Sequence, residues 1–276
     1  MKLPVSVLVL TKDEEQDLPG CLESISWSDD IHLYDSYSID RTVEIAKAAG
    51  ATVTQRKFDN WSAHQNWGLA NLPFKNEWVF YIDADERVTE GLRDSIAKAI
   101  SNPGHAVAFR LRRRDFFLDT WLKHVQATPF YTRLFKPQHI SYERLVNPIT
   151  KVDGPVKDIE GYLDHYPFSK GMVHWFARHN SYSTFEAQQI IENRRGHAKF
   201  SMGKAFFGKD FAERRFHQKE LFYRLPNRPA FKFWLLYLLR GGFLDGRAGF
   251  TYSKLQAIYE YMIVLKVREL EAAQKK

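Results

Sequence analysis

The chain has 276 residues, of which 44% are hydrophobic and 26% charged, and its formal net charge at pH 7 is +7. This composition is typical of a globular protein with a buried core, and it excludes an intrinsically disordered or fibrous chain. No window of about 18 uncharged apolar residues occurs, so no segment is expected to span a membrane by itself.

Cysteine is rare in the chain. Cys21 is the single cysteine, which excludes an internal disulfide. The apolar run at the start of the sequence is short and acidic residues follow it, unlike a secretory signal peptide. We therefore expect a reducing, cytoplasmic location.

Charge is divided unevenly along the chain. Residues 1–100 hold 10 Lys+Arg and 17 Asp+Glu, whereas residues 101–276 hold 30 and 16. An acidic first part suits a site that holds a metal ion, and a basic second part suits a diphosphate, a nucleic acid or an anionic membrane. Solvated helix faces are the alternative explanation for both parts.

Strands and helices are predicted to alternate through the first 90 residues. Residues 5–10 form a continuous β-branched and apolar run, typical of a strand buried on both faces of a parallel sheet. Further strands are expected at residues 31–34, 51–55 and 78–82, and helices at residues 18–26, 42–49 and 62–71. Gly50 is expected to end the second helix. This alternation predicts a mostly parallel sheet with right-handed crossovers.

The pattern is looser in the second part of the chain. Strands are expected at residues 107–112 and 132–135, and a helix at residues 174–191. The last 80 or so residues are basic, aromatic and mainly helical in pattern. Their most apolar stretch, residues 231–240, is too short to span a membrane but long enough to lie in its interface.

Acidic side chains follow two of the predicted strands. Asp35 comes at the end of the second strand, and Asp83 and Asp85 follow the fourth. In open α/β sheets, ligands bind beyond the carboxyl ends of the strands. In Asp83-Ala84-Asp85 the side chains alternate in direction, so one carboxylate can hold Mg²⁺ or Mn²⁺ while the other faces a ligand. The chain has neither a dinucleotide fingerprint nor a P-loop, so phosphates must be bound in another way.

Two nearby aspartates are given different roles. Asp35 is expected to accept hydrogen bonds from a base or a ribose. Asp40 lies just before the second helix and is expected to cap the free N–H groups at the start of that helix.

Three stretches of the first 90 residues carry a resemblance to a known family. They read VSVLVLTKDEE from residue 5, DSYSIDRTVEIAKAAGA from residue 35 and WVFYIDADERV from residue 78. In their order and spacing they resemble the family 2 glycosyltransferases of the GT-A fold. Four shorter stretches resemble the bacterial branch that includes the lipopolysaccharide core β-1,4-glucosyltransferases. These are YTRLF at 131–135, VDG at 152–154, LDHY at 163–166 and GFLDG at 242–246.

The resemblance implies an α/β protein with the GT-A fold, in which helices flank a mostly parallel, Rossmann-like sheet. The catalytic domain is expected over residues 1–190, with a nucleotide-sugar half at residues 1–100 and an acceptor half at residues 101–190. Residues 191–276 are expected to form a helical extension, which holds 18 Lys+Arg and 8 Asp+Glu. This extension is expected to associate with an anionic membrane, and packing against a second copy in a homodimer is the alternative.

The activity that the resemblance implies is a metal-dependent, inverting hexosyl transfer. A sugar such as glucose moves from a UDP-sugar to a hydroxyl of a lipid-linked glycan, in the synthesis of bacterial lipopolysaccharide or another cell-surface polysaccharide. The protein is then peripheral on the inner face of the bacterial inner membrane. Mg²⁺ or Mn²⁺ neutralises the charge of the departing nucleoside diphosphate.

Site residues are carried over where the motifs match. Thr11, Glu14 and Asp35 are expected to line the nucleotide pocket. Asp83 is expected to contact ribose and diphosphate, and Asp85 to hold the metal.

Histidines and an arginine beyond the D-x-D motif are also candidates. His165 follows Leu163-Asp164 and is expected to bind the metal or the diphosphate, or else to be structural. His174 and Arg178 share one face of a predicted helix. They either clamp the diphosphate, with Arg178 in the nucleotide-sugar site, or contact only solvent.

The general base is the least defined residue. The bacterial branch commonly shows Val-His-Glu where this chain has Val146-Asn147-Pro148, so the usual carboxylate is absent. Candidate replacements are Glu143, Asp153 and Asp158, with Asp115 from an earlier loop. We take Asp153 as the predicted base and Asp115 as the alternative. The alternative to a catalytic role is that Asp153 begins a turn at Asp153-Gly154-Pro155.

Two aromatic or basic features have open roles. Trp61 either stacks on a ring of the donor or packs in the core. Arg112-Arg113-Arg114 either contacts an anionic glycan or lipid phosphate, or flanks a strand as solvated charge.

Two other classes of protein are alternatives to an enzyme. A nucleic-acid-binding protein explains a pI of about 9.3 but not the acidic first 100 residues, whose carboxylates repel phosphate. A catalytically silent nucleotide-sugar-binding module of the same fold is compatible with the absent Glu, whereas the presence of both Asp83 and Asp85 favours an enzyme.

Overall fold

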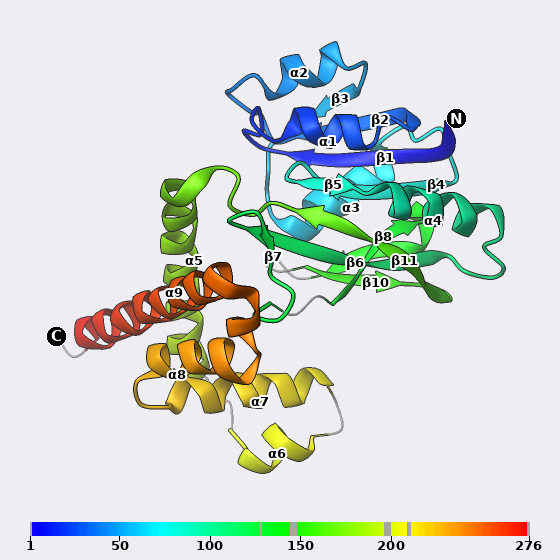
Figure 1. Ribbon diagram of the computed structural model, residues 1–276. Helices are drawn as coiled ribbons and strands as arrows, with labels where there is room; N and C mark the ends of the chain where they lie inside the picture. Colours follow the sequence, from blue (N-terminus) through cyan, green and yellow to red (C-terminus); the bar gives the residue numbers. More distant parts are fainter. Residues whose placement is uncertain (1, 127–128, 144–147, 196–199, 209–210, 275–276) are drawn as a thin grey trace. The chain divides into compact units, whose positions relative to one another are not determined.

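The computed structural model describes residues 2–126, 129–143, 148–195, 200–208 and 211–274. Contacts divide the chain into two units (Figure 1). The first unit consists of Met1–Phe116 and Thr128–Ser169, and the second of Phe117–Ala127 and Lys170–Lys276.

A mixed β-sheet forms the centre of the first unit. Its strands lie in the order β3-β2-β1-β4-β8-β6-β11-β5. Their bounds are β1 Leu3–Thr11, β2 Ser28–Asp35, β3 Thr52–Gln55, β4 Trp78–Asp83, β5 Glu86–Val88, β6 Ala108–Phe117, β8 Phe130–Phe135 and β11 Val156–His165. The first four strands are parallel to one another, as predicted, and β6 is parallel to β11. The strands β8 and β5 run antiparallel to their neighbours.

Helices connect the parallel strands. They are α1 Leu18–Ser24, α2 Thr42–Ala48, α3 Trp61–Asn71 and α4 Glu90–Ser101. Asn60 caps α3 by accepting from the N–H of Ala63, and Thr89 caps α4 by accepting from the N–H of Leu92. Gly50 follows α2 with φ of 78°, a left-handed conformation that glycine adopts without strain. A separate antiparallel pair, β9 Ile140–Glu143 and β10 Ile149–Val152, follows a short 3₁₀ helix, η1 Pro137–His139.

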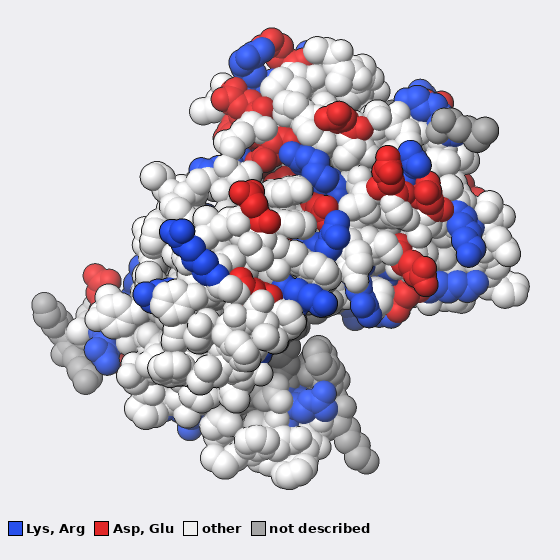
Figure 2. Space-filling model, in the orientation of Figure 1, with Lys and Arg blue, Asp and Glu red and all other residues white. Residues whose placement is uncertain are grey.

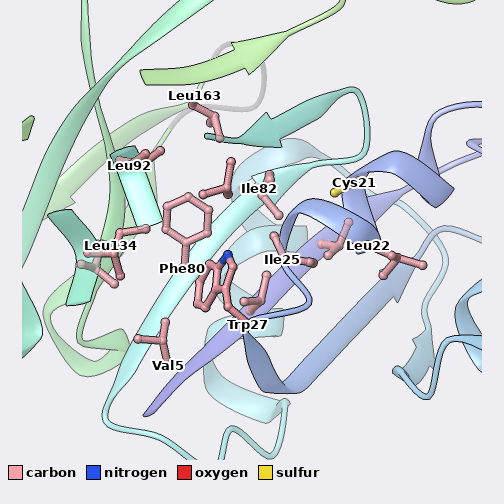
Figure 3. Close-up of a cluster of buried hydrophobic side chains, with 14 of the residues drawn as sticks. Val5, Cys21, Leu22, Ile25, Trp27, Phe80, Ile82, Leu92, Leu134 and Leu163 are labelled. Atoms are coloured by element: carbon pink, nitrogen blue, oxygen red, sulfur yellow. The ribbon is translucent and has the colours of Figure 1, made fainter. Parts of the chain in front are cut away.

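The larger hydrophobic cluster of the first unit lies on one face of this sheet, under α1 and α4, and a second cluster on the other face holds Leu8, Val79 and Phe135. Phe80 of β4 is fully buried, and Trp27 packs edge-on against it with 6.1 Å between the ring centroids. Figure 3 shows Ile82, Leu92 and Cys21 in the same cluster. Cys21 is fully buried, and burial raises the pKa of its thiol. This packing fixes β4, whose last residue is Asp83.

The second unit is mainly helical. It holds β7 Thr120–Trp121, α5 Gly171–Arg195, α6 Met202–Phe207, α7 Phe211–Arg224, α8 Arg228–Trp234, a π-helical segment η2 Leu235–Leu239, a 3₁₀ helix η3 Gly242–Asp245, and α9 Gly246–Ala273. Ile190, Ile191 and Ile263 form a small core between α5 and α9. The predicted domain boundary after residue 190 lies inside α5, and the assignment of residues 191–276 as an extension stays a prediction. Among the described helices, none combines the length and hydropathy that crossing a membrane requires.

Candidate active site

Three polar side chains lie at the carboxyl edge of the parallel strands. The register pairs Thr11 at the end of β1 with Asp35 at the end of β2. It also pairs Leu10 of β1 with Asp83 at the end of β4. Asp35 and Asp83 therefore share one edge of the sheet, as the order of strands predicts, at the place where such sheets bind ligands.

Asp35 is fully buried and organises this edge. Its carboxylate accepts from Thr11 Oγ1 at 3.0 Å, from the N–H of Ser38 at 2.9 Å, and from the Ser38 hydroxyl. Gln55 Nε2 donates to the same carboxylate at 2.9 Å. These four donors match the number of acceptor sites on a carboxylate. A ligand that hydrogen-bonds Asp35 must therefore displace a side chain such as Gln55.

The loop after β1 is bonded to the loop before α2. Asp13, with φ of 54°, accepts from the N–H of Ile39 at 2.8 Å. The N–H of Glu14 donates to Thr42 Oγ1 at 2.7 Å, which places Glu14 beside the start of α2. Asp40 accepts from the N–H groups of Glu15 and Thr42, both at 3.0 Å, so it does bond the start of α2 as predicted.

Residues of α3 line the same side of the sheet. His64 stacks on Tyr34 with 4.1 Å between the ring centroids. Arg56 Nη1 lies 3.2 Å from His64 Nδ1 and can only donate, so the proton of the neutral ring is on Nε2, which lies 3.3 Å from Ser36 Oγ. Burial and the nearby Arg56 lower the pKa of His64. Trp61 is 42% exposed and packs edge-on against Phe58 rather than in the core.

The first aspartate of the D-x-D motif is held by two neighbours. Tyr81 donates its hydroxyl to Asp83 Oδ1 at 2.6 Å, and Arg133 Nη2 donates to Asp83 Oδ2 at 3.0 Å. The guanidinium of Arg133 also lies over the ring of Tyr81, 4.3 Å from its centroid. The side chain of Asp83 is still 36% exposed, so it is both oriented and accessible.

A buried glutamate completes this arrangement, and nothing in the sequence singles it out beyond its place directly after the motif. Glu86 is fully buried and accepts from the N–H of Asp83 at 2.9 Å and from Arg133 Nη2 at 2.8 Å. Burial raises the pKa of Glu86. Burial acts to lower the pKa of Arg133, but Glu86 and Asp83 outweigh it and raise that pKa. Arg133 thus bridges the two carboxylates in a setting of low dielectric.

The second aspartate of the motif belongs to a chain of three side chains. The register aligns Glu86 of β5, His165 of β11 and Asp115 of β6 across neighbouring strands. His165 Nε2 lies 3.2 Å from Asp85 Oδ2, and His165 Nδ1 is bonded to Asp115. Burial acts to lower the pKa of His165, but the bonds to Asp115 and Asp85 outweigh it and raise that pKa to about 9.

Asp85 and His165 fit a divalent metal when their chemistry is considered. Mg²⁺ is usually bound by one or two carboxylates together with substrate phosphates and waters, and imidazole is a ligand for transition metals. A carboxylate on the second nitrogen of a ligating histidine is the usual outer-shell partner, and Asp115 has that position. The described residues contain no group of three or more His, Cys, Asp or Glu that could hold a metal without such additional ligands.

The two carboxylates predicted as general base have different positions. Asp115 is 2% exposed and adjoins Asp85 through His165. The N–H of Asp153 donates to the carbonyl of His139, near the amino end of β6 and β11. Asp115 lies seven positions after Ala108 along β6, or about 23 Å at the rise of a strand. This separation argues against a proton transfer to Asp153 at the carboxyl edge.

Other predicted residues lie away from this edge or have partners of their own. Asp158 pairs with Arg110 at 2.7 Å, and Glu143 lies 3.6 Å from Lys151 on the β9-β10 pair. Arg178 and His174 lie on α5 in the second unit, and their role stays a prediction. Of Val146-Asn147-Pro148, where the family shows Val-His-Glu, residues 146 and 147 lie outside the described residues.

The arginine cluster at residues 112–114 is divided among three contacts. Arg112 lies over the ring of Phe130, 4.7 Å from its centroid. Arg113 Nε is 3.1 Å from Asp115, and Arg114 Nε is 2.6 Å from Asp164. Arg113 therefore adds a cation beside the Asp85–His165–Asp115 chain.

The chain is similar in sequence to known proteins. A glycosyltransferase of Rickettsia bellii is 25% identical over 273 residues, which are 96% of this chain and 86% of that protein. The lipopolysaccharide core biosynthesis glycosyltransferase LpsC of Rhizobium meliloti is 24% identical over 291 residues, or 98% of this chain and 94% of LpsC.

Solved structures include that of S. aureus TarS 1–349, which is 14% identical and aligns with a TM-score of 0.43 over 95% of this chain and 91% of that one. The glucosyl-3-phosphoglycerate synthase of Mycobacterium tuberculosis, crystallised with Mn²⁺ and UDP, is 20% identical with a TM-score of 0.35 over 40% of this chain and 44% of that one. The model of the family described as glycosyl transferase family 2 matches residues 6–152, more than half of the chain. The chain belongs to that family and has its GT-A fold.

Proposed function

We propose that this family 2 glycosyltransferase transfers a hexose, such as glucose, from a UDP-sugar to a hydroxyl of a lipid-linked glycan, with inversion. The observation that carries the proposal is the placement of Asp83 and Asp85 at the carboxyl edge, with Asp35 beside them and His165 on Asp85. The likeness to LpsC supports lipopolysaccharide, or another cell-surface polysaccharide, as the product. The enzyme works at the cytoplasmic face of the inner membrane.

The donor site is assigned to residues of the first unit. Thr11, Glu14 and Asp35 form the wall for the nucleoside, with Gln55 displaced from Asp35 when the base or ribose binds. Asp83 faces the ribose and diphosphate, because Tyr81 and Arg133 hold its carboxylate while leaving it exposed. Arg178 stays a predicted partner of the diphosphate.

Asp85 and His165 are the residues that would hold Mg²⁺ or Mn²⁺. The metal would neutralise the charge that develops on the departing diphosphate. Asp115 then acts as a positioning residue, since its bond to Nδ1 fixes the ring and leaves Nε2 directed at Asp85. Asp153 is not retained as the general base, because it lies at the opposite end of β6 and β11.

Calorimetric titration of UDP and several UDP-sugars tests the donor class. The titrations use Mn²⁺, Mg²⁺ and a chelator, on the unchanged protein and on Asp85→Asn. We expect metal-dependent binding that Asp85→Asn loses, and the tightest UDP-sugar identifies the donor. Asp94→Asn is the matched control, since its carboxylate is 70% exposed on α4. A folded protein that binds no uridine nucleotide would overturn the proposal.

Transfer must be measured separately from binding. A lipid-linked acceptor with radiolabelled UDP-glucose gives labelled product if the chain is an enzyme. Tight, metal-dependent binding with neither transfer nor slow hydrolysis of the donor would instead identify a silent binding module.

A further inference from the structure

Large apolar side chains are exposed in a continuous series at the end of α8 and through the next two short helices. Their exposed fractions are Trp234 53%, Leu238 51%, Leu239 78%, Phe243 50% and Leu244 61%. We call these five side chains the Trp234–Leu244 surface. Apolar residues of this size are usually buried, and a contiguous exposed patch of them marks an interaction site.

The backbone beneath this surface is fixed by buried contacts. Asp245 is 7% exposed and accepts from the N–H of His124 at 3.0 Å and of Val125 at 2.8 Å. A Cβ on Gly249 would come within 2.0 Å of the carbonyl oxygen of Gly242, so η3 and the first turn of α9 are in direct backbone contact. The five apolar side chains are therefore presented by a rigid support rather than by a segment that can fold them inward.

Aromatic rings pack beside the exposed side chains, with Phe233 against Trp234 and Tyr237 against Phe243. Phe233 stacks on Tyr237 with 5.4 Å between the ring centroids. Phe250 of α9 packs edge-on against both rings, at 5.8 Å from Phe233 and 5.4 Å from Tyr237. These ring contacts join α8, η2 and α9, so the segment that carries the exposed side chains is packed against the rest of the unit.

The charge around the surface is positive. Within residues 228–254, all of which the structure describes, Asp245 is the single acidic residue, and it is buried by the contacts above. The cations Arg240, Arg247 and Lys254 are exposed in the same segment, with Lys254 Nζ 4.3 Å from the ring centroid of Phe250. On the face that Figure 2 shows, charged side chains are sparse over α8 and the start of α9.

We propose that the Trp234–Leu244 surface inserts into the interface of an anionic lipid bilayer. Trp and Leu side chains gain by entering the interfacial region, and nearby Arg and Lys side chains are attracted to anionic head groups. A second copy docking by the same surface would bring the three cations of each copy together, which disfavours a dimer there. This inference rests on the proposed function, because a lipid-linked acceptor is held at the surface of a bilayer.

Co-sedimentation of the full chain with vesicles tests the proposal. Vesicles of phosphatidylcholine with phosphatidylglycerol are compared with phosphatidylcholine alone. The double variant Leu239→Asp/Leu244→Asp is expected to lower the partition coefficient at least about tenfold on the anionic vesicles. Arg240→Glu/Arg247→Glu is expected to lower it about tenfold or more there and to abolish the preference for anionic lipid. All four substituted positions are exposed, so circular dichroism should be unchanged.

Val173→Asp is the matched control. Val173 is 87% exposed in the first turn of α5, in the same unit. Its substitution should leave the partition coefficient within about twofold of the unchanged protein. An equal loss in Val173→Asp would overturn the assignment to the Trp234–Leu244 surface.

Two further outcomes would also overturn it. One is that the unchanged protein does not bind anionic vesicles. The other is that sedimentation equilibrium shows a dimer that Leu239→Asp/Leu244→Asp dissociates, with no change in vesicle binding. Metal-dependent UDP binding, measured without vesicles, separates the two proposals. A chain that binds UDP but not vesicles contradicts this inference alone, and one that binds vesicles but not UDP contradicts the proposed donor.

Discussion

The two ends of the sheet in the first unit bury carboxylates in different ways. At the amino end, Asp30 is 2% exposed and is fully occupied by bonds within the unit. It accepts from the N–H of Lys75 at 2.8 Å and from Ser6 Oγ, and lies 3.0 Å from His32 Nε2. Burial acts to raise the pKa of Asp30, but the Ser6 and Lys75 donors outweigh it and lower that pKa.

At the carboxyl end the two carboxylates of the D-x-D motif are bonded to Arg133 or His165 and remain within reach of solvent. Asp83 and Asp85 are 36% and 23% exposed in their side chains. Behind them, Glu86 has a raised pKa and His165 one of about 9. A carboxylate whose hydrogen bonds are all made within the unit and whose pKa is lowered, such as Asp30, suits a structural role. Accessible carboxylates next to groups with shifted pKa values suit chemistry. Substitutions of Asp30 and of Asp85 should therefore separate stability from activity.

The largest expected effect is on activity, at Asp85. Asp85→Asn removes one charged ligand for the metal while keeping the size of the side chain. We expect kcat/KM for sugar transfer to fall about 1000-fold, the scale of losing one electrostatic contact in a transition state. The melting temperature should change by no more than about 2 °C, because Asp85 is not in the core. Asp94→Asn should change neither quantity.

Arg133 should show the largest effect on stability. Arg133→Met leaves Glu86 buried without its main cationic partner, which costs about 4 kcal/mol of unfolding free energy in comparable buried pairs. Urea unfolding followed by tryptophan fluorescence measures it. Arg133→Met/Glu86→Gln should recover more than half of the loss, since no buried charge is left unpaired. UDP should still bind more weakly to the double variant, because Asp83 has lost the group that orients it. Full recovery of UDP binding would contradict that role for Arg133.

The difference between Asp85 and Arg133 also shows what the sequence could predict. Apolar runs that end in acidic residues identify Asp35, Asp83 and Asp85, because parallel strands bring their carboxyl ends to one edge. Arg133 and Glu86 meet across β8, β4 and β5, and His165 meets Asp115 across β11 and β6. Hydrophobic patterns give the faces of a strand but not its partner 50 residues away. Pairing between distant strands therefore had to come from the structure.

The same argument explains the prediction about Asp153. Asp153 is predicted as the base because it closely follows residues 146–148, where the family's carboxylate is absent, and the sequence does not say at which end of a strand it lies. The register does, because β11 begins beside Ala108 and ends beside Asp115.

At the amino end, Asp30→Ala should reduce stability without affecting catalysis. It leaves Ser6, His32 and the N–H of Lys75 buried without their acceptor, which we expect to cost about 3 kcal/mol of unfolding free energy. In the unchanged protein this contribution is present above the unfolded pKa of Asp, near 4, and is lost as the pH falls through the lower folded pKa. The adjacent, exposed Asp29→Ala is the control, with a change under about 0.5 kcal/mol. Loss of kcat per folded molecule in Asp30→Ala would remove the contrast between the two ends.

The smallest expected effect concerns Asp115, which acts on the metal only through His165. Asp115→Asn should weaken Mn²⁺ binding about tenfold to a hundredfold, the usual range for a partner of a ligating histidine. Asp158→Asn, on the same sheet but paired with Arg110 at the amino end of β6, should leave Mn²⁺ binding unchanged. Calorimetry with Mn²⁺ alone measures both variants.

The pH dependence of stability gives Asp115 a readout that does not need the metal. The folded pKa of His165, about 9, is above its ordinary value of 6.5 because Asp115 and Asp85 stabilise the imidazolium. The stabilisation that follows is complete below pH 6.5 and is lost as the pH rises through about 9. In chelator, the melting temperature of the unchanged protein should therefore fall between pH 6.5 and 9, and Asp115→Asn should flatten that fall. If Asp115→Asn instead lowers the melting temperature equally at every pH, Asp115 supports the packing of β6 and β11 rather than the charge of His165.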